Sequence, residues 1–197
     1  MYYISKYLKI SEGKVWLNGQ LQFQSAQEDW SEMIKELFKN RSVSYPKFYK
    51  MDDLCKLAFV GSEWMLADES DKEIALLFSN SEASLETDLR HQETIQTEEN
   101  FFPSPAVFVY TLPNITIGEV SIRHQLQTES CFFVSDEFPV ETMESYANYL
   151  LKTQKANKVF CAWIHKLQNS YEAQFYMVEK EGILEHNSKN ITKIVRE

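Results

Sequence analysis

The chain has 197 residues, of which 44% are hydrophobic, and a formal net charge of −9. This length suits one domain, and we expect a single domain over residues 1–197. This negative net charge argues against binding to a nucleic-acid backbone, which requires clustered lysine and arginine. No apolar run approaches the roughly 20 residues of a membrane span. The first ten residues lack the layout of a signal peptide, so we expect a cytoplasmic protein.

The cysteines and glycines exclude several kinds of site. Cys55, Cys131 and Cys161 are widely spaced and lie among apolar neighbours, which predicts reduced, buried thiols. No Cys-x-x-Cys or His-x-x-x-His pair occurs, so no metal site is expected. Only five glycines are present, and neither GxGxxG nor the P-loop pattern occurs, so no cofactor is expected.

Hydrophobic periodicity divides the first half of the chain into alternating strands and helices. The helix over 29–39 is the clearest, because Trp30, Met33, Ile34, Leu37 and Phe38 recur at helical spacing. The other expected elements are strands at 2–9 and 14–17 around a turn at Glu12-Gly13, a long apolar helix at 47–68, a buried strand at 73–79, a polar exposed helix at 84–96 and a loop at 97–104.

The second half is expected to follow the same pattern, which indicates a layered α/β domain. The expected elements are a strand or extended segment at 105–112, a helix at 114–125 with Gly118 at a tight approach, a buried strand at 130–135, a helix at 139–154, and a hairpin of strands at 158–165 and 171–178. Ser135 or Asp136 is the expected N-cap of the 139–154 helix.

Four short segments follow one another in an order that a known family shares. They are Lys50-Met51-Asp52 at a helix start, the strand and loop 74–88, the stretch 103–122 with Asn114, Gly118, Ser121 and Ile122, and the strand 130–135 that leads into a helix and two further strands. Over about residues 45–180 the chain resembles the N-terminal half of the thiolase-like β-ketoacyl-acyl-carrier-protein synthases. The likeness is greatest to the short ketoacyl-synthase-like proteins of aryl polyene and flexirubin-type pathways. The resemblance implies a thiolase-like half domain, with a mixed five-stranded sheet and helices packed on its faces.

The chain departs from this family at the nucleophile. Active members carry a cysteine in a Thr-Ala-Cys turn, about fifteen residues after the Ser/Thr-Ile pair. Gap-free counting from Ile122 puts that position at Glu137, six residues after Cys131. The family also uses two histidines and a lysine from its C-terminal half, and the resemblance implies that this chain lacks them. Because a carboxylate cannot form the thioester, we expect the reaction to be lost.

Two interpretations of Glu137 stay open. It either caps the following helix, where the helix dipole favours negative charge, or mimics a malonyl-type carboxylate in an inactive pocket or beside a partner's site. Cys131 is a weaker alternative, because free cysteines are most often buried structural thiols.

Three functions follow from the resemblance. The first is a non-catalytic ketosynthase-like subunit that acts with a ketosynthase, an acyl carrier protein or a second copy in fatty-acid or polyketide-type biosynthesis. A half-length thiolase-like chain would expose an apolar association surface. The second is an acyl-chain-binding module lined by Phe108, Tyr110, Phe132 and Phe133. The third is a small acyltransferase that uses Cys131.

Overall fold

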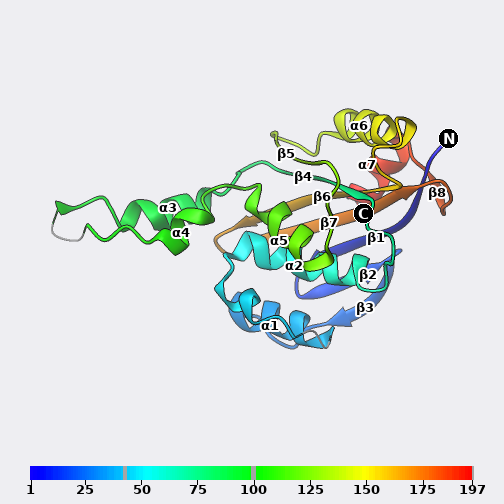
Figure 1. Cartoon of the computed structure of the whole chain (residues 1–197). Coiled ribbons are helices and arrows are strands. Elements are labelled where there is room, and N and C mark those ends of the chain that lie inside the picture. Colours follow the sequence, from blue (N-terminus) through cyan, green and yellow to red (C-terminus); the bar gives the residue numbers. More distant parts are fainter. Residues whose placement is uncertain (42–43, 99–100, 197) are drawn as a thin grey trace.

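A mixed sheet with helices on both faces forms the body of the protein, and a helical arm projects from one end (Figure 1). The computed structural model describes residues 1–41, 44–98 and 101–196. In chain order the elements are β1 (Tyr3–Ser11), β2 (Lys14–Leu17), β3 (Gln20–Gln24), α1 (Trp30–Asn40), the 3-10 helix η1 (Pro46–Lys50), α2 (Asp53–Leu66), β4 (Ile74–Asn80), α3 (Leu85–Glu93), α4 (Pro105–Val109), α5 (Ile115–His124), β5 (Ser130–Val134), α6 (Val140–Lys152), β6 (Lys158–Leu167), β7 (Ser170–Glu179), β8 (Leu184–Glu185) and α7 (Ser188–Arg196).

Among the described residues, the sheet has eight strands in the order β3-β2-β1-β7-β6-β4-β5, with β8 paired to β1. Strands β4, β5 and β6 are parallel, whereas β6 and β7 form the expected antiparallel hairpin. The sheet is thus larger than the five strands expected. The turn Asn18-Gly19, with positive φ at both residues, adds β3 to β2. Such a pair is the strongest short-range signal of a hairpin.

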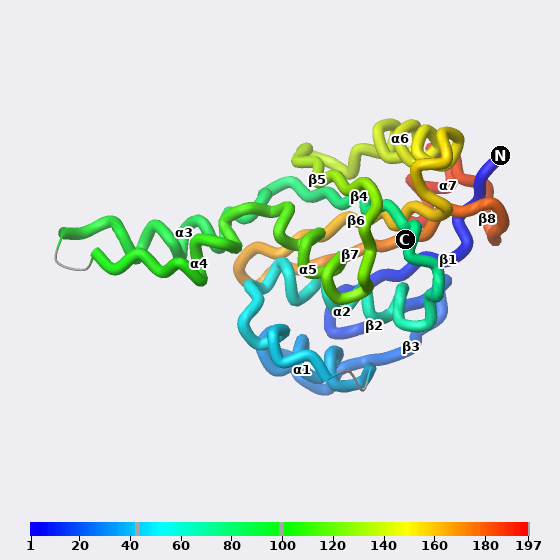
Figure 2. Tube along the Cα trace, viewed as in Figure 1, coloured from blue at the N-terminus to red at the C-terminus, as the bar shows by residue number. Residues whose placement is uncertain are grey.

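Helices cover the two faces of the sheet and enclose separate cores. One core lies under α1, α2 and α5, and the other under α6 and α7. Figure 2 follows the chain from the body out along α3 and back along α4. Among the described residues, no helix combines the length and the apolar character that crossing a bilayer requires.

The long helix expected over 47–68 is broken in the structure. Met51 is extended, with ψ of 152°, and separates η1 from α2. Asp52 caps α2, because its Oδ1 accepts a hydrogen bond of 2.9 Å from the Cys55 amide. An aspartate at this position satisfies an amide that has no partner within the helix.

Three further expectations differ from the structure. Residues 105–112 contain the helix α4, whose N-cap Ser104 accepts a hydrogen bond from the Val107 amide. β5 is the edge strand of the sheet and is half-exposed rather than buried. A side-chain Cβ on Gly118 would meet no atom within 4 Å, so this glycine marks no tight approach.

Candidate functional site

The expected site lies where β5 ends and α6 begins. β5 pairs with β4 on one side and forms the end of the sheet on the other. Glu137 is exposed in the connecting loop, and its carbonyl oxygen accepts a hydrogen bond of 2.7 Å from Ser135 Oγ. The N-cap of α6 is Pro139, with no side-chain cap hydrogen bond. Neither Glu137, Ser135 nor Asp136 caps the helix, so the capping interpretation is wrong.

Cys131 lies at the second position of β5, on the face that α6 covers. It is a free thiol and half-buried, whereas Cys55 and Cys161 are fully buried free thiols. Burial, and then the charge of Glu129, raise the pKa of Cys131. A reactive cysteine requires the opposite shift, because the thiolate is the nucleophile. The surroundings of Cys131 therefore disfavour nucleophilic catalysis.

A groove of about 570 Å³ runs beside the β5 edge, lined by Cys131, Phe133, Thr142, Ser145, Tyr146 and Tyr149. Tyr146 forms its wall, because its ring lies edge-on to Phe133 at 6.2 Å and stacks with Tyr149 at 6.2 Å. The Tyr146 hydroxyl donates a hydrogen bond to the Glu129 carboxylate, which raises the pKa of Tyr146 to about 12. This network fixes α6 against β5 and leaves an aromatic surface beside the sheet edge.

The four aromatic residues expected to line an acyl pocket are not brought together. Phe132 packs against the core beneath α5, and Phe133 against the core beneath α6, so they lie on opposite faces of β5. Phe108 is 59% exposed on the arm. Tyr110 is buried and donates a hydrogen bond of 3.1 Å to Glu119 Oε1. These positions do not form a common cavity.

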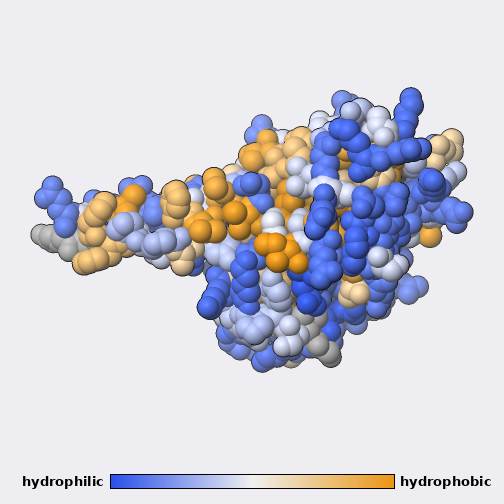
Figure 3. Space-filling view, in the orientation of Figure 1, coloured by the Kyte–Doolittle hydropathy of each residue, from blue (hydrophilic) through white to orange (hydrophobic). Residues whose placement is uncertain are grey.

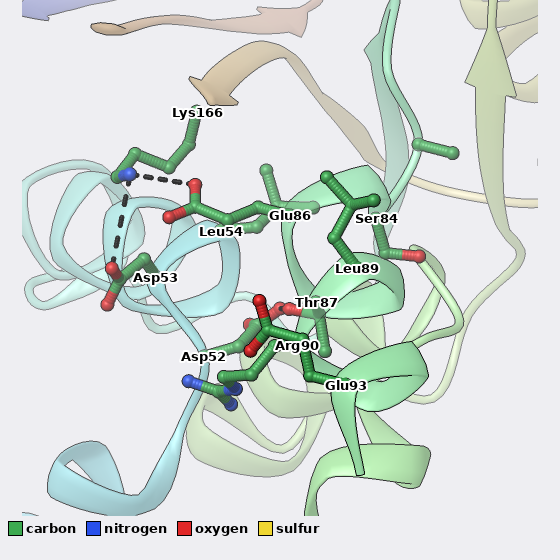
Figure 4. A pocket seen from close by; sticks show the side chains of 11 residues that line it. Asp52, Asp53, Leu54, Ser84, Glu86, Thr87, Leu89, Arg90, Glu93 and Lys166 are labelled. Carbon is green, nitrogen blue, oxygen red and sulfur yellow. Dashed lines mark hydrogen bonds and ion pairs between the residues drawn. The ribbon is translucent and has the colours of Figure 1, made fainter. Parts of the chain in front are cut away.

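A polar pocket of about 280 Å³ at the root of the arm was not expected from the sequence (Figure 4). Lys166 Nζ lies 2.9 Å from Glu86 Oε2 and 3.9 Å from Asp53 Oδ2, and its side chain is 2% exposed. On the opposite wall, Thr87 Oγ1 donates a hydrogen bond of 2.8 Å to Asp52 Oδ2. The pocket joins α2, α3 and the β6–β7 hairpin. Buried Lys166 is paired with Glu86, and buried Asp52 accepts hydrogen bonds from Thr87 and the Cys55 amide. We interpret these contacts as an anchor for the arm.

Comparisons with known proteins give matches at the level of structure. No family model matches the chain, and no curated protein sequence matches it. Solved structures of ketosynthases superpose on most of it. This chain has the thiolase-like fold of ketosynthases. The fold inferred from the order of the four sequence segments is confirmed.

Three of these ketosynthase structures indicate the extent of the likeness. A ketosynthase, ApeO, in complex with its chain length factor, ApeC, from Xenorhabdus doucetiae gives a TM-score of 0.62 at 12% identity, over 92% of this chain and 79% of that one. The ishigamide ketosynthase/chain length factor gives 0.68 at 14% identity, over 90% and 62%. A β-ketoacyl synthase from Burkholderia phymatum gives 0.59 at 13% identity, over 91% and 59%. This chain thus spans about three fifths of the length of the ishigamide and Burkholderia proteins.

Glu137 lies in the loop that follows β5 and precedes α6. The five residues between these elements, Ser135 to Pro139, contain no cysteine. Among the described residues, no group of three or more His, Cys, Asp or Glu side chains is placed to hold a metal ion.

Proposed function

We propose that this protein is a non-catalytic, ketosynthase-like subunit that binds a ketosynthase along the free edge of β5. The observation that carries the proposal is the unpaired outer edge of β5 among the described residues. Ser130–Val134 has no charged residue and no proline, and β4 is its one strand partner among the described residues. An uncharged, apolar edge strand with open backbone groups is a template for pairing with another chain.

The residues near this edge support a non-catalytic role. By the gap-free count from Ile122, Glu137 takes the place of the thiol that a condensing enzyme would need, and burial raises the pKa of Cys131. Two of the structural neighbours are described as ketosynthase and chain length factor together. By analogy, the partner is a ketosynthase, and the pathway is an acyl-carrier-protein-dependent fatty-acid or polyketide type such as aryl polyene synthesis.

The alternation of backbone hydrogen bonds along β5 identifies a variant that blocks the edge alone. The Leu76 amide donates to the Glu129 carbonyl, and the Ser135 amide donates to Asn80. Odd-numbered residues of β5 therefore face β4, and the amide of Val134 faces outward. Val134 is 56% exposed, so its side chain contributes little to the core.

The test is co-expression of the tagged chain with the ketosynthase encoded in the same genome. We expect the two to co-purify. Val134→Pro removes an outward amide at an edge position where proline is tolerated, and is expected to weaken binding at least tenfold with little change in melting temperature. Val134→Thr keeps the amide and is the matched control. A wild-type chain that stays monomeric, or pairs with itself alone, would show the proposal to be wrong.

A further inference from the structure

The arm, defined as residues 85–98 and 101–112, carries an unusual share of exposed apolar surface. It makes up 26 of the 197 residues. Of the fourteen exposed large hydrophobic side chains among the described residues, seven belong to it: Leu85, Leu89, Phe101, Phe102, Phe108, Val109 and Leu112. Figure 3 shows hydrophobic side chains along the arm and at its junction with the body. Contiguous apolar surface of this kind marks interaction sites.

The arm is also acidic. Its described residues include four acidic residues, Glu86, Asp88, Glu93 and Glu98, and one arginine, Arg90, for a net charge of −3. Glu86 is paired with Lys166 at the root. Asp88, Glu93 and Glu98 are exposed, so negative charge borders the apolar side chains.

A contact with the body at the root and contacts between α3 and α4 hold the arm together. At the root, the Thr87 hydroxyl donates a hydrogen bond to Asp52. The Ser84 hydroxyl donates one to the Thr111 carbonyl and so joins the two ends of the arm. Further out, the Phe102 amide donates to the Thr94 carbonyl over 2.9 Å. The rings of His91 and Phe108 lie 5.4 Å apart and join α3 to α4. A surface held in place before binding loses less conformational entropy when it docks.

The negative charge of the arm favours some classes of binding partner over others. A second copy of this chain, with a net charge of −9, would be repelled, and so would nucleic acids and anionic membranes. A protein surface with lysines and arginines around an apolar depression satisfies both features. Outside the arm, Ile122 on α5 and Val134 on β5 are also exposed apolar side chains.

We propose that the arm docks into an apolar depression bordered by lysines and arginines on a partner protein. The inference rests on the proposed function, so the partner is the ketosynthase, and the arm forms a second contact beyond the β5 edge. Apolar side chains of the arm supply contact area, and its carboxylates orient the encounter. Binding therefore depends on salt concentration.

The experiment measures the dissociation constant for the co-expressed ketosynthase at 50 and 500 mM salt. We expect Leu89→Ser with Phe108→Ser to weaken binding at least tenfold at both salt concentrations. Asp88→Lys with Glu93→Lys is expected to weaken binding at 50 mM and to remove most of the salt dependence. Matched controls away from the arm are Leu21→Ser with Ile183→Ser, and Glu28→Lys with Glu181→Lys, all at exposed positions. Melting temperatures of all variants verify that they fold.

The outcomes separate this inference from the proposed function. If the wild type binds, Val134→Pro abolishes binding and both arm variants bind as the wild type does, the arm inference is wrong and the β5 interface stands. If the charge controls weaken binding as much as the arm charges, the effect is one of net charge and the arm inference is also wrong. If the wild type binds no ketosynthase, both proposals are wrong.

Discussion

Thr87 Oγ1 donates a hydrogen bond of 2.8 Å to Asp52 Oδ2, which joins the first turn of α3 to the start of α2. The same carboxylate caps α2 through the Cys55 amide. Asp52 is 4% exposed, and burial raises its pKa. One side chain thus stabilises a helix start and holds the root of the arm.

Substitution of Asp52 should destabilise the protein in proportion to the acceptors lost. Asp52→Ala removes the cap and leaves the buried Thr87 hydroxyl without its acceptor, at a cost of about 1–3 kcal/mol in the free energy of unfolding. Asp52→Asn keeps one acceptor and should cost less. Urea unfolding checks both variants. Equal stability of Asp52→Ala and the wild type would contradict this account of the root.

Two buried histidines predict a loss of stability in mild acid. Burial lowers the pKa of His124 to about 4 despite Glu63 at 3.5 Å, and burial lowers that of His186 to about 4. In the unfolded chain both pKa values are near 6.5. Between these values the unfolded state binds more protons, so the free energy of unfolding falls as the pH drops from about 6.5 to about 4.

The slope of this pH dependence identifies the groups responsible. Each histidine contributes up to about 1.4 kcal/mol per pH unit in that window. His124→Gln with His186→Gln removes both titrations and should flatten the curve of urea midpoint against pH between 6.5 and 4. A double variant that keeps the full slope would assign the effect to other groups. Carboxylates with lowered pKa, such as Glu69 and Glu82, would be the next to examine.

Cys131 should react slowly with thiol reagents and should not become acylated. Its pKa is raised, so little thiolate is present at neutral pH. Alkylation at pH 7.5 followed by mass mapping should modify Cys131 more slowly than a free cysteine. Cys55 and Cys161 are fully buried, so the reagent should modify them only after the protein is denatured. Cys131→Ser is the control for assignment. Rapid labelling, or a thioester formed with an acyl donor, would restore the acyltransferase hypothesis.

Local sequence patterns predicted the elements that carry their own start signals or that are apolar throughout. All seven residues of β4 are buried, and the apolar run that predicts this strand is continuous. The segment 105–112 misled, because its apolar residues favour a strand, while Ser104 and Pro105 carry the helix-start signal. The exposure of β5 depends on the order of the strands, which periodicity within a segment does not contain.

The candidate site likewise combines features that local sequence patterns contain with contacts between residues far apart in the sequence. Counting along the chain assigns the nucleophile position to Glu137, and this assignment stays a prediction; Glu137 lies in the loop before α6. The root of the arm joins Asp52, Thr87 and Lys166, which are 35 and 79 residues apart in the sequence. Their pairing arises when α3 packs beside α2 and the β6–β7 hairpin, so no local pattern predicts it.

Gly61 and Gly118 both lie within helices and should respond to alanine in opposite directions. On α2, a Cβ at Gly61 would lie 2.2 Å from the ring of Phe175, which is 1% exposed and stacked on Phe160. Gly61→Ala therefore forces α2 away from the sheet and should cost about 1–3 kcal/mol. On α5, a Cβ at Gly118 would meet no atom within 4 Å. Gly118→Ala should raise the free energy of unfolding by up to about 1 kcal/mol.

Urea unfolding of the two alanine variants tests how closely α2 lies on β7. Because both changes replace a helical glycine, they alter the unfolded chain in the same way, and the difference between them isolates the contact with Phe175. A second substitution, Phe175→Leu, removes the ring and should recover part of the stability that Gly61→Ala loses. If Gly61→Ala were as stable as Gly118→Ala, the close packing of this helix against the sheet would be contradicted.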